Sequence, residues 1–215
     1  MVKAVIFDMD GLMFDTEKLW EETFLVVGRQ IGYDLNEEFH NKTIGTNYKT
    51  IKGIFENEFG KDFPFDEFYT KARKYMDGVI SEKGLVLKKG LLELISYLKE
   101  NNYLMVVASS AKMDRINWYL DVSGIDRKMF DTIISGDDIK RGKPNPDIFI
   151  KACQKLGLKG EETIVLEDSN NGIRAAKKAG CISVLIPDLD IVNDSFDYKL
   201  ESLLDVIDLL EEKVI

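Results

Sequence analysis

Short runs of apolar and β-branched residues recur along this chain, and segments with helical periodicity separate most of them. The runs occupy residues 2–7, 103–108, 132–135, 163–166 and 182–186. Runs that are apolar on both faces are typical of buried parallel strands. Strands that alternate with helices form a parallel sheet with helices on both faces. The sequence therefore predicts an α/β fold with a doubly wound, Rossmann-like parallel sheet.

One interval departs from this alternation. It shows helical periodicity at residues 17–30, 36–42, 47–59 and 66–82, and no convincing strand. The interval is rich in phenylalanine and tyrosine, which are enough to form a small core of their own. We therefore predict a helical domain at residues 16–83, inserted into a catalytic α/β core of residues 1–15 and 84–215. The leucine-rich stretch 200–210 is predicted to be a closing amphipathic helix.

Polar and charged side chains follow the predicted strands at the points where those strands end. The first strand is followed by Asp8 and Asp10, and the second by Ser109. Lys143 follows the third strand, and the pair 167–168, Glu-Asp, comes at the end of the fourth. Because ligands in open α/β sheets bind beyond the carboxyl ends of the strands, we expect these groups to meet at one edge.

Carboxylates, a hydroxyl and an ammonium at one edge of a sheet are the groups that phosphoryl transfer needs. Asp8, Asp168 and Glu167 concentrate negative charge, and hard carboxylate oxygens suit Mg²⁺. Together with Lys143 and Ser109, the metal would hold a phosphate while a carboxylate attacks phosphorus. A second aspartate two residues on is placed to protonate the leaving oxygen and later to deprotonate water. Each motif is weak alone, but all of them in this order at successive strand ends form a strong signal.

Composition excludes several other classes of protein. The formal net charge of −9 argues against a nucleic-acid-binding surface. With a single histidine, His40, catalysis by a Ser-His-Asp triad is not expected, and Cys153 and Cys181 lack the spacing of a zinc site.

The N-terminus does not resemble a signal peptide, and no apolar run is long enough to span a bilayer. We expect a cytoplasmic protein with no membrane partner, and a monomer, although oligomeric state leaves no mark in the sequence.

These motifs resemble those of the haloacid dehalogenase superfamily over essentially the whole chain. FDMDGLMFDT is similar to its first motif, VVASSA to its second, GKPNPDIF to its third and VLEDSNNG to its fourth. The resemblance implies that Asp8 is the nucleophile and Asp10 the general acid and base, with Ser109 and Lys143 on the phosphoryl group. It also implies Mg²⁺ bound by Asp8, the backbone carbonyl of Asp10, and Asp168, with Glu167 close by. The helical insert is similar to the small cap domain of the family.

The subclass follows from departures within the family pattern. Dehalogenases and phosphonate hydrolases of the superfamily lack an aspartate at the position of Asp10, so neither activity is expected. The resemblance is greatest to the beta-phosphoglucomutase-like branch, whose mutases carry a histidine at the position of Trp20 and basic residues at those of Ile44 and Tyr48. We therefore predict a phosphatase of the sugar-phosphate type, acting on a sugar phosphate or nucleoside monophosphate. A hexose-phosphate mutase is the first alternative, and a receiver-like phospho-acceptor domain is a remote one.

Overall fold

The structure is a computed structural model that describes residues 1–188 and 195–212. Within these residues the strands form one six-stranded parallel sheet with the order β3-β2-β1-β4-β5-β6. The strands are β1 (Ala4–Phe7), β2 (Leu104–Ala108), β3 (Thr132–Ile134), β4 (Thr163–Glu167), β5 (Ile182–Leu185) and β6 (Tyr198–Lys199). This order is that of a doubly wound Rossmann-like sheet, so the predicted fold class is confirmed. The sixth strand was not predicted, because two residues are too few to show a periodic pattern.

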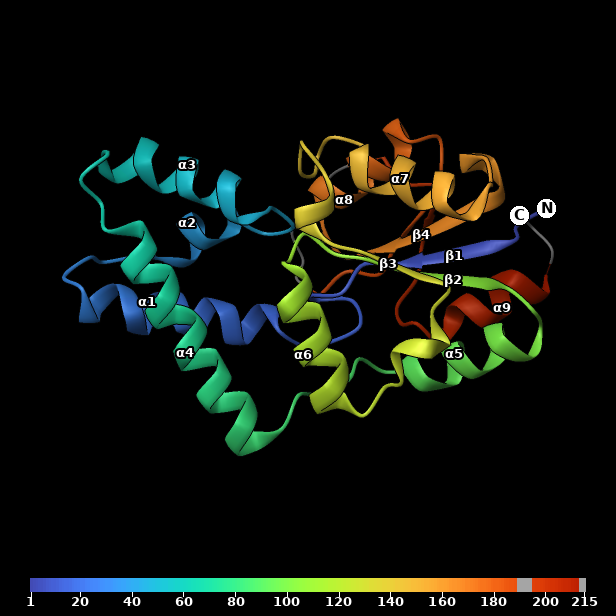
Figure 1. Cartoon of the computed structure of the whole chain (residues 1–215), viewed down its shortest axis with the longest axis horizontal. Coiled ribbons are helices and arrows are strands. Elements are labelled where there is room, and N and C mark those ends of the chain that lie inside the picture. Colours follow the sequence, from blue (N-terminus) through green and yellow to red (C-terminus); the bar gives the residue numbers. More distant parts are fainter. Residues whose placement is uncertain (189–194, 213–215) are drawn as a thin grey trace.

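Helices cover both faces of the sheet (Figure 1). On one face lie α5 (Leu91–Glu100), α6 (Met113–Ser123) and α9 (Asp205–Glu211), and on the other lie α7 (Asp147–Leu156) and α8 (Asn170–Lys178). Short 3-10 helices, η1 (Arg127–Met129), η2 (Gly136–Asp138) and η3 (Gly160–Glu162), link some of the elements. Successive side chains of a strand point to opposite faces, so Val5 and Phe7 enter one apolar cluster and Ile6 enters the other.

The helical insert contains α1 (Glu17–Gln30), α2 (Glu37–Asn41), α3 (Tyr48–Phe59) and α4 (Phe65–Lys83). These helices form a group beyond the carboxyl ends of the strands (Figure 1). They share an apolar cluster separate from the two clusters of the sheet, with Phe24 and Phe55 fully buried in it. The assignment of residues 16–83 to a separate cap domain stays a prediction, which this separate cluster supports.

The predicted C-terminal helix is wrong in its starting point. The helix α9 begins only at Asp205, whereas Leu200 donates its backbone N–H to the carbonyl of Leu185 and thereby continues the sheet. Ser202 then donates both its backbone N–H and its hydroxyl to the Asp205 carboxylate, at 2.8 and 3.0 Å, which closes the turn before the helix. Within the described ranges, no helix has both the length and the apolar character needed to cross a membrane.

Candidate active site

The centre of the site is the point where the order of the strands reverses. The chain runs outward from β1 through β2 to β3 and then returns to β4 on the other side of β1. Asp8 follows the end of β1, and Glu167 ends β4 beside it. The backbone N–H of Asp8 donates to the carbonyl of Leu166 at 3.1 Å, which fixes the two segments against each other. Ligands of open α/β sheets bind at this kind of crevice.

Lys143 lies between two of the predicted carboxylates. Its ammonium group is 1 % exposed and forms ion pairs with both Asp8 and Glu167. Burial alone would lower the pKa of Lys143, but the two carboxylates outweigh this effect and raise it. Lys143 is therefore a permanent positive charge at the floor of the site.

Asp8, Glu167 and Asp168 are all buried, and each offers a carboxylate oxygen within 4.8 Å of the other two. Burial away from water raises the pKa of the Asp8 carboxyl to about 8, even though Lys143 acts in the opposite direction. Burial, together with the charges of Glu167 and Asp8, raises the pKa of Asp168 well above its usual range. One ammonium cannot neutralise three buried carboxylates, so this cluster suits a divalent cation with hard oxygen ligands.

Backbone packs directly against these carboxylates. Gly11 has a φ of +78°, and a Cβ there would lie 2.1 Å from an oxygen of Asp168. A Cβ at Gly172 would lie 1.8 Å from the carboxyl carbon of Glu167. Glycine is required at both places because any side chain would occupy the position of a carboxylate. The carboxylates of Glu167 and Asp168 are thus held in place by main chain.

Asp10 has a different environment from the other carboxylates. The hydroxyl of Thr16 donates to Asp10 at 3.0 Å and accepts from the backbone N–H of Gly11 at 3.3 Å. Burial raises the pKa of Asp10, while this hydrogen bond and the charges of Arg115 and Lys143 act to lower it. A raised pKa favours the protonated form of the carboxyl, which is the form that a general acid needs.

Ser109 lies at the end of β2 and is 1 % exposed. Its backbone N–H donates to the carbonyl of Ile134, and its hydroxyl oxygen accepts the N–H of Ala111 at 3.1 Å. Ser109, Asp8 and Asp10 line one cavity, and Lys143, Glu167 and Asp168 lie around Asp8 in the wall behind it. The structure thus brings every predicted site residue together.

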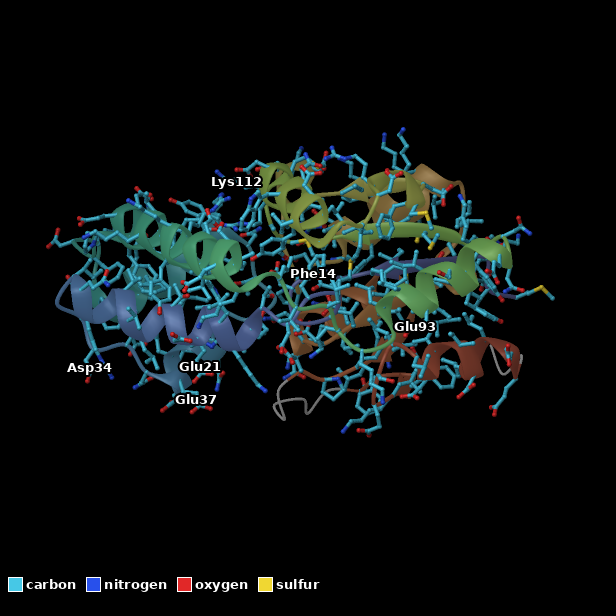
Figure 2. All side chains as sticks on the ribbon, turned by 90° about the horizontal axis from the view of Figure 1, so that it is seen from below. Phe14, Glu21, Asp34, Glu37, Glu93 and Lys112 are labelled. Carbon is cyan, nitrogen blue, oxygen red and sulfur yellow. The ribbon has the colours of Figure 1, made fainter. Side chains whose placement is uncertain are left out.

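The cavity lies between the sheet edge and the helical insert. Figure 2 shows Phe14 at this junction, with Lys112 at its border, where the Lys112 ammonium lies 5.5 Å from the centre of the Tyr48 ring. The three positions at which the sequence departs from the mutases of the branch all line the cavity, namely Trp20, Ile44 and Tyr48. Asn47, next to Tyr48, accepts the N–H of Thr50 and caps the start of α3.

Several residues of the cavity wall were not predicted. The unpredicted polar lining includes Thr16, Glu17, Arg73 and Arg115. Glu17 is the one that carried a sequence signal, because an acidic residue at the start of a helix so close to Asp15 is a marked concentration of charge. His40 is fully buried on α2, where burial lowers its pKa to about 4 and so keeps the ring neutral.

Comparison with known proteins extends these observations. A model of the family described as haloacid dehalogenase-like hydrolase matches residues 5–186. A phosphorylated carbohydrates phosphatase of Thermotoga maritima is 30% identical over 185 residues, which are 83% of this chain and 82% of that protein. Hexitol phosphatase B of Escherichia coli K12 is 28% identical over 207 residues, or 94% of this chain and 93% of that protein.

The fold is also similar to that of solved structures. CbbY from Rhodobacter sphaeroides, crystallised in complex with phosphate, superposes with a TM-score of 0.83 at 25% identity. The superposition covers 96% of this chain and 96% of that one. The similarity thus includes the helices of the insert as well as the sheet.

Proposed function

The chain belongs to the haloacid dehalogenase-like hydrolase family and is a phosphoric monoester hydrolase, and we propose that it acts on a small sugar phosphate or nucleoside monophosphate through a phosphoryl group carried on Asp8. One observation carries the proposal. Asp8 lines the cavity, beside a buried ammonium and two further buried carboxylates, with Asp10 in the same cavity. This is the charge arrangement that a phosphoryl group in transfer requires.

The residues would act in two steps. In the first, an oxygen of Asp8 forms a bond to phosphorus, the bond between phosphorus and the leaving oxygen breaks, and Asp10 gives its proton to that oxygen. In the second, Asp10 takes a proton from water, whose oxygen attacks phosphorus and releases phosphate from Asp8. Ser109 would donate its hydroxyl to a phosphoryl oxygen, and Lys143 would hold another oxygen by its charge.

The carboxylate cluster fits a metal ion. Asp8, Asp168 and the backbone carbonyl of Asp10 would hold Mg²⁺, with Glu167 beside them, and the ion would neutralise charge on the phosphoryl group. The fit rests on the excess of buried carboxylates over ammonium groups and on the spacing of their oxygens. Phosphate release is expected to require Mg²⁺ and to stop in EDTA.

A screen of phosphorylated metabolites tests both the activity and the metal. Free phosphate would be measured with Mg²⁺, with Ca²⁺, after chelation, and after Mg²⁺ is restored. Ca²⁺ should substitute poorly, because it takes more ligands at longer distances than Mg²⁺ does. Full activity after exhaustive chelation would contradict the assignment of Asp8 and Asp168 as ligands.

The cavity supports a hydrolase over a hexose-phosphate mutase. Trp20 lines the cavity at the position where mutases of this branch carry a histidine, and an indole cannot supply the proton transfer of that histidine. A sugar 1-phosphate separates the two reactions, since a hydrolase yields free phosphate and a mutase yields an isomeric phosphate. A receiver-like domain has no need of a substrate cavity, and its phosphorylated aspartate would persist instead of turning over.

Asp10→Asn tests the proposed proton transfers. The variant is expected to lose about 10²- to 10⁴-fold in kcat on a sugar phosphate, the usual contribution of general acid–base catalysis. Thr16 can still donate to the asparagine oxygen, so the local fold should persist. Substrates with a good leaving group should lose less in the first step, and phosphorylated Asp8 should then accumulate and be visible by intact mass. If Asp10→Asn hydrolysed the sugar phosphate at the wild-type rate, the Asp10 side chain would have no part in proton transfer, and only its backbone carbonyl could contribute to the site.

A further inference from the structure

Two arginines line the active-site cavity, and the proposed phosphoryl transfer uses neither of them. Arg115 projects from the first turn of α6, and Arg73 comes from α4 of the insert. The side chain of Arg115 is only 9% exposed, and its guanidinium lies 4.9 Å and 5.1 Å from the ring centres of Trp118 and Tyr119. The guanidinium of Arg115 is thus a positive charge held largely out of water beside the reaction centre.

Each arginine uses only part of its donor set. Nη1 of Arg115 pairs with Asp77 at 2.5 Å, and Nη2 of Arg73 reaches Asp114 at 3.5 Å. A guanidinium has five N–H donors in a planar fork that suits two oxygens at once. Among residues 1–188 and 195–212, no second acceptor side chain pairs with either guanidinium. Both arginines, which line the cavity, therefore have guanidinium N–H groups that pair with no side chain of these residues.

The hydroxyls of two tyrosines add to this excess of donors. Tyr69 on α4 and Tyr119 on α6 both line the cavity, and within the described part of the chain neither hydroxyl has a hydrogen-bond partner. Asp10 lies near the same wall, since the charges of Arg115 and Asp10 act on the titration of both tyrosines. A leaving group that takes its proton from Asp10 would therefore extend toward a wall rich in hydrogen-bond donors.

We propose that Arg115, assisted by Arg73, binds a second anionic group on the substrate, a carboxylate or a second phosphate. The preferred substrate is then an acidic phosphate ester, in which the leaving group carries its own negative charge. The inference rests on the phosphatase function proposed above and narrows its substrate class. Ile44 and Tyr48 offer no cation, so the charge that recognises the second anion comes from α6 and α4.

A purely structural role for Arg115 makes a different prediction. If the arginine only ties α6 to α4 through Asp77, then Asp77→Asn and Arg115→Met should have the same consequences. If Arg115 binds substrate, Asp77→Asn leaves the guanidinium in the cavity and retains the preference for acidic substrates. Arg115→Met keeps an apolar stem against Trp118 and removes the charge, so the preference should disappear.

The test compares two substrates that differ in one group. Gluconate 6-phosphate and glucitol 6-phosphate share an open six-carbon chain, and only the first has a carboxylate at its far end. The wild-type protein is expected to favour gluconate 6-phosphate by about 10- to 100-fold in kcat/KM, the range of a charge-assisted hydrogen bond. Arg115→Met should reduce that ratio to near one, mainly through KM. Arg127→Met, which removes an exposed ion pair with Asp121, is the matched control and should leave the ratio unchanged.

The outcomes separate this inference from the proposed function. Equal kcat/KM for the two substrates in the wild-type protein, or the same ratio in Arg115→Met as in wild type, would overturn the second-anion subsite. Loss of the ratio in Asp77→Asn as well would assign Arg115 a structural role and also overturn it. Turnover that survives in Asp8→Asn would instead overturn the proposed mechanism. If both esters turn over slowly, their inhibition constants against p-nitrophenyl phosphate hydrolysis give the same ratio.

Discussion

Asp8→Asn is expected to abolish steady-state phosphate release, with a loss of at least about 10⁴-fold in kcat, as is typical when a nucleophile is removed. The amide is a poor nucleophile and a poor ligand for a hard cation. Because Asn is nearly the same size as Asp, the hydrogen bond from the Asp8 backbone to Leu166 should remain. The loss of kcat in Asp8→Asn would therefore come from the missing nucleophile and not from misfolding.

Stability provides the check on that conclusion. Burial raises the pKa of Asp8 to about 8 from an ordinary value near 3.8, so the folded state disfavours its ionised form. A neutral side chain relieves this cost above pH 4, and Asp8→Asn should unfold at the same urea concentration as wild type or a higher one. Asp121→Asn, on an exposed ion pair, serves as the control. Substantial hydrolysis by a folded Asp8→Asn protein would exclude a covalent intermediate on this residue.

Lys143→Met is expected to impair both stability and activity. The ammonium is 1 % exposed and pairs with Asp8 and Glu167, so its removal leaves two buried carboxylates facing each other. Breaking a buried ion pair by removing one partner typically costs about 3–5 kcal/mol. Activity should fall as well, since the charge that would hold a phosphoryl oxygen is lost. The matched control is Lys159→Met, because that lysine is 79% exposed and pairs with Glu161 at the surface.

The destabilisation of Lys143→Met should depend on pH in a definite direction. A carboxyl whose pKa is raised by folding binds more protons in the folded state than in the unfolded state, so stability falls as pH rises. For Asp8 this window runs from about pH 4 to about pH 8, and loss of Lys143 extends it upward. Urea unfolding at pH 6 and pH 8 should show the larger loss at pH 8. An equal loss at the two pH values would show that the carboxylates do not sense Lys143.

The sequence predicts the sheet and the floor of the site for the same physical reason. Buried parallel strands need continuous apolar runs, and side chains that follow their carboxyl ends meet at one edge, as Asp8, Lys143 and Glu167 do. The cavity wall is different. Arg115 and Tyr69 lie on helices whose meeting depends on contacts between distant parts of the chain, such as that of Arg115 with Asp77. No local pattern encodes such a contact.

Helix ends and buried polar groups escaped prediction for related reasons. Leucines at 200–204 match a helical pattern, but the sheet takes the backbone N–H of Leu200 and the helix starts later. The polar and acidic neighbours of His40 in the sequence give no sign of burial, yet its ring lies 5.0 Å from that of Phe24 inside the insert. In both cases tertiary packing outweighs the local preference.

The origin of the cavity lining has a consequence for how this protein could acquire new substrates. The residues assigned to phosphoryl transfer all lie outside residues 16–83, whereas much of the remaining lining, including Trp20, Tyr48 and Tyr69, lies within them. Codon randomisation confined to the lining positions of this segment from Trp20 onward would vary the selectivity of the pocket, leave the reactive groups intact and keep Thr16, which holds Asp10. A modest library of that kind could be selected for growth on unfamiliar phosphate sources, with every clone inheriting the same chemical step.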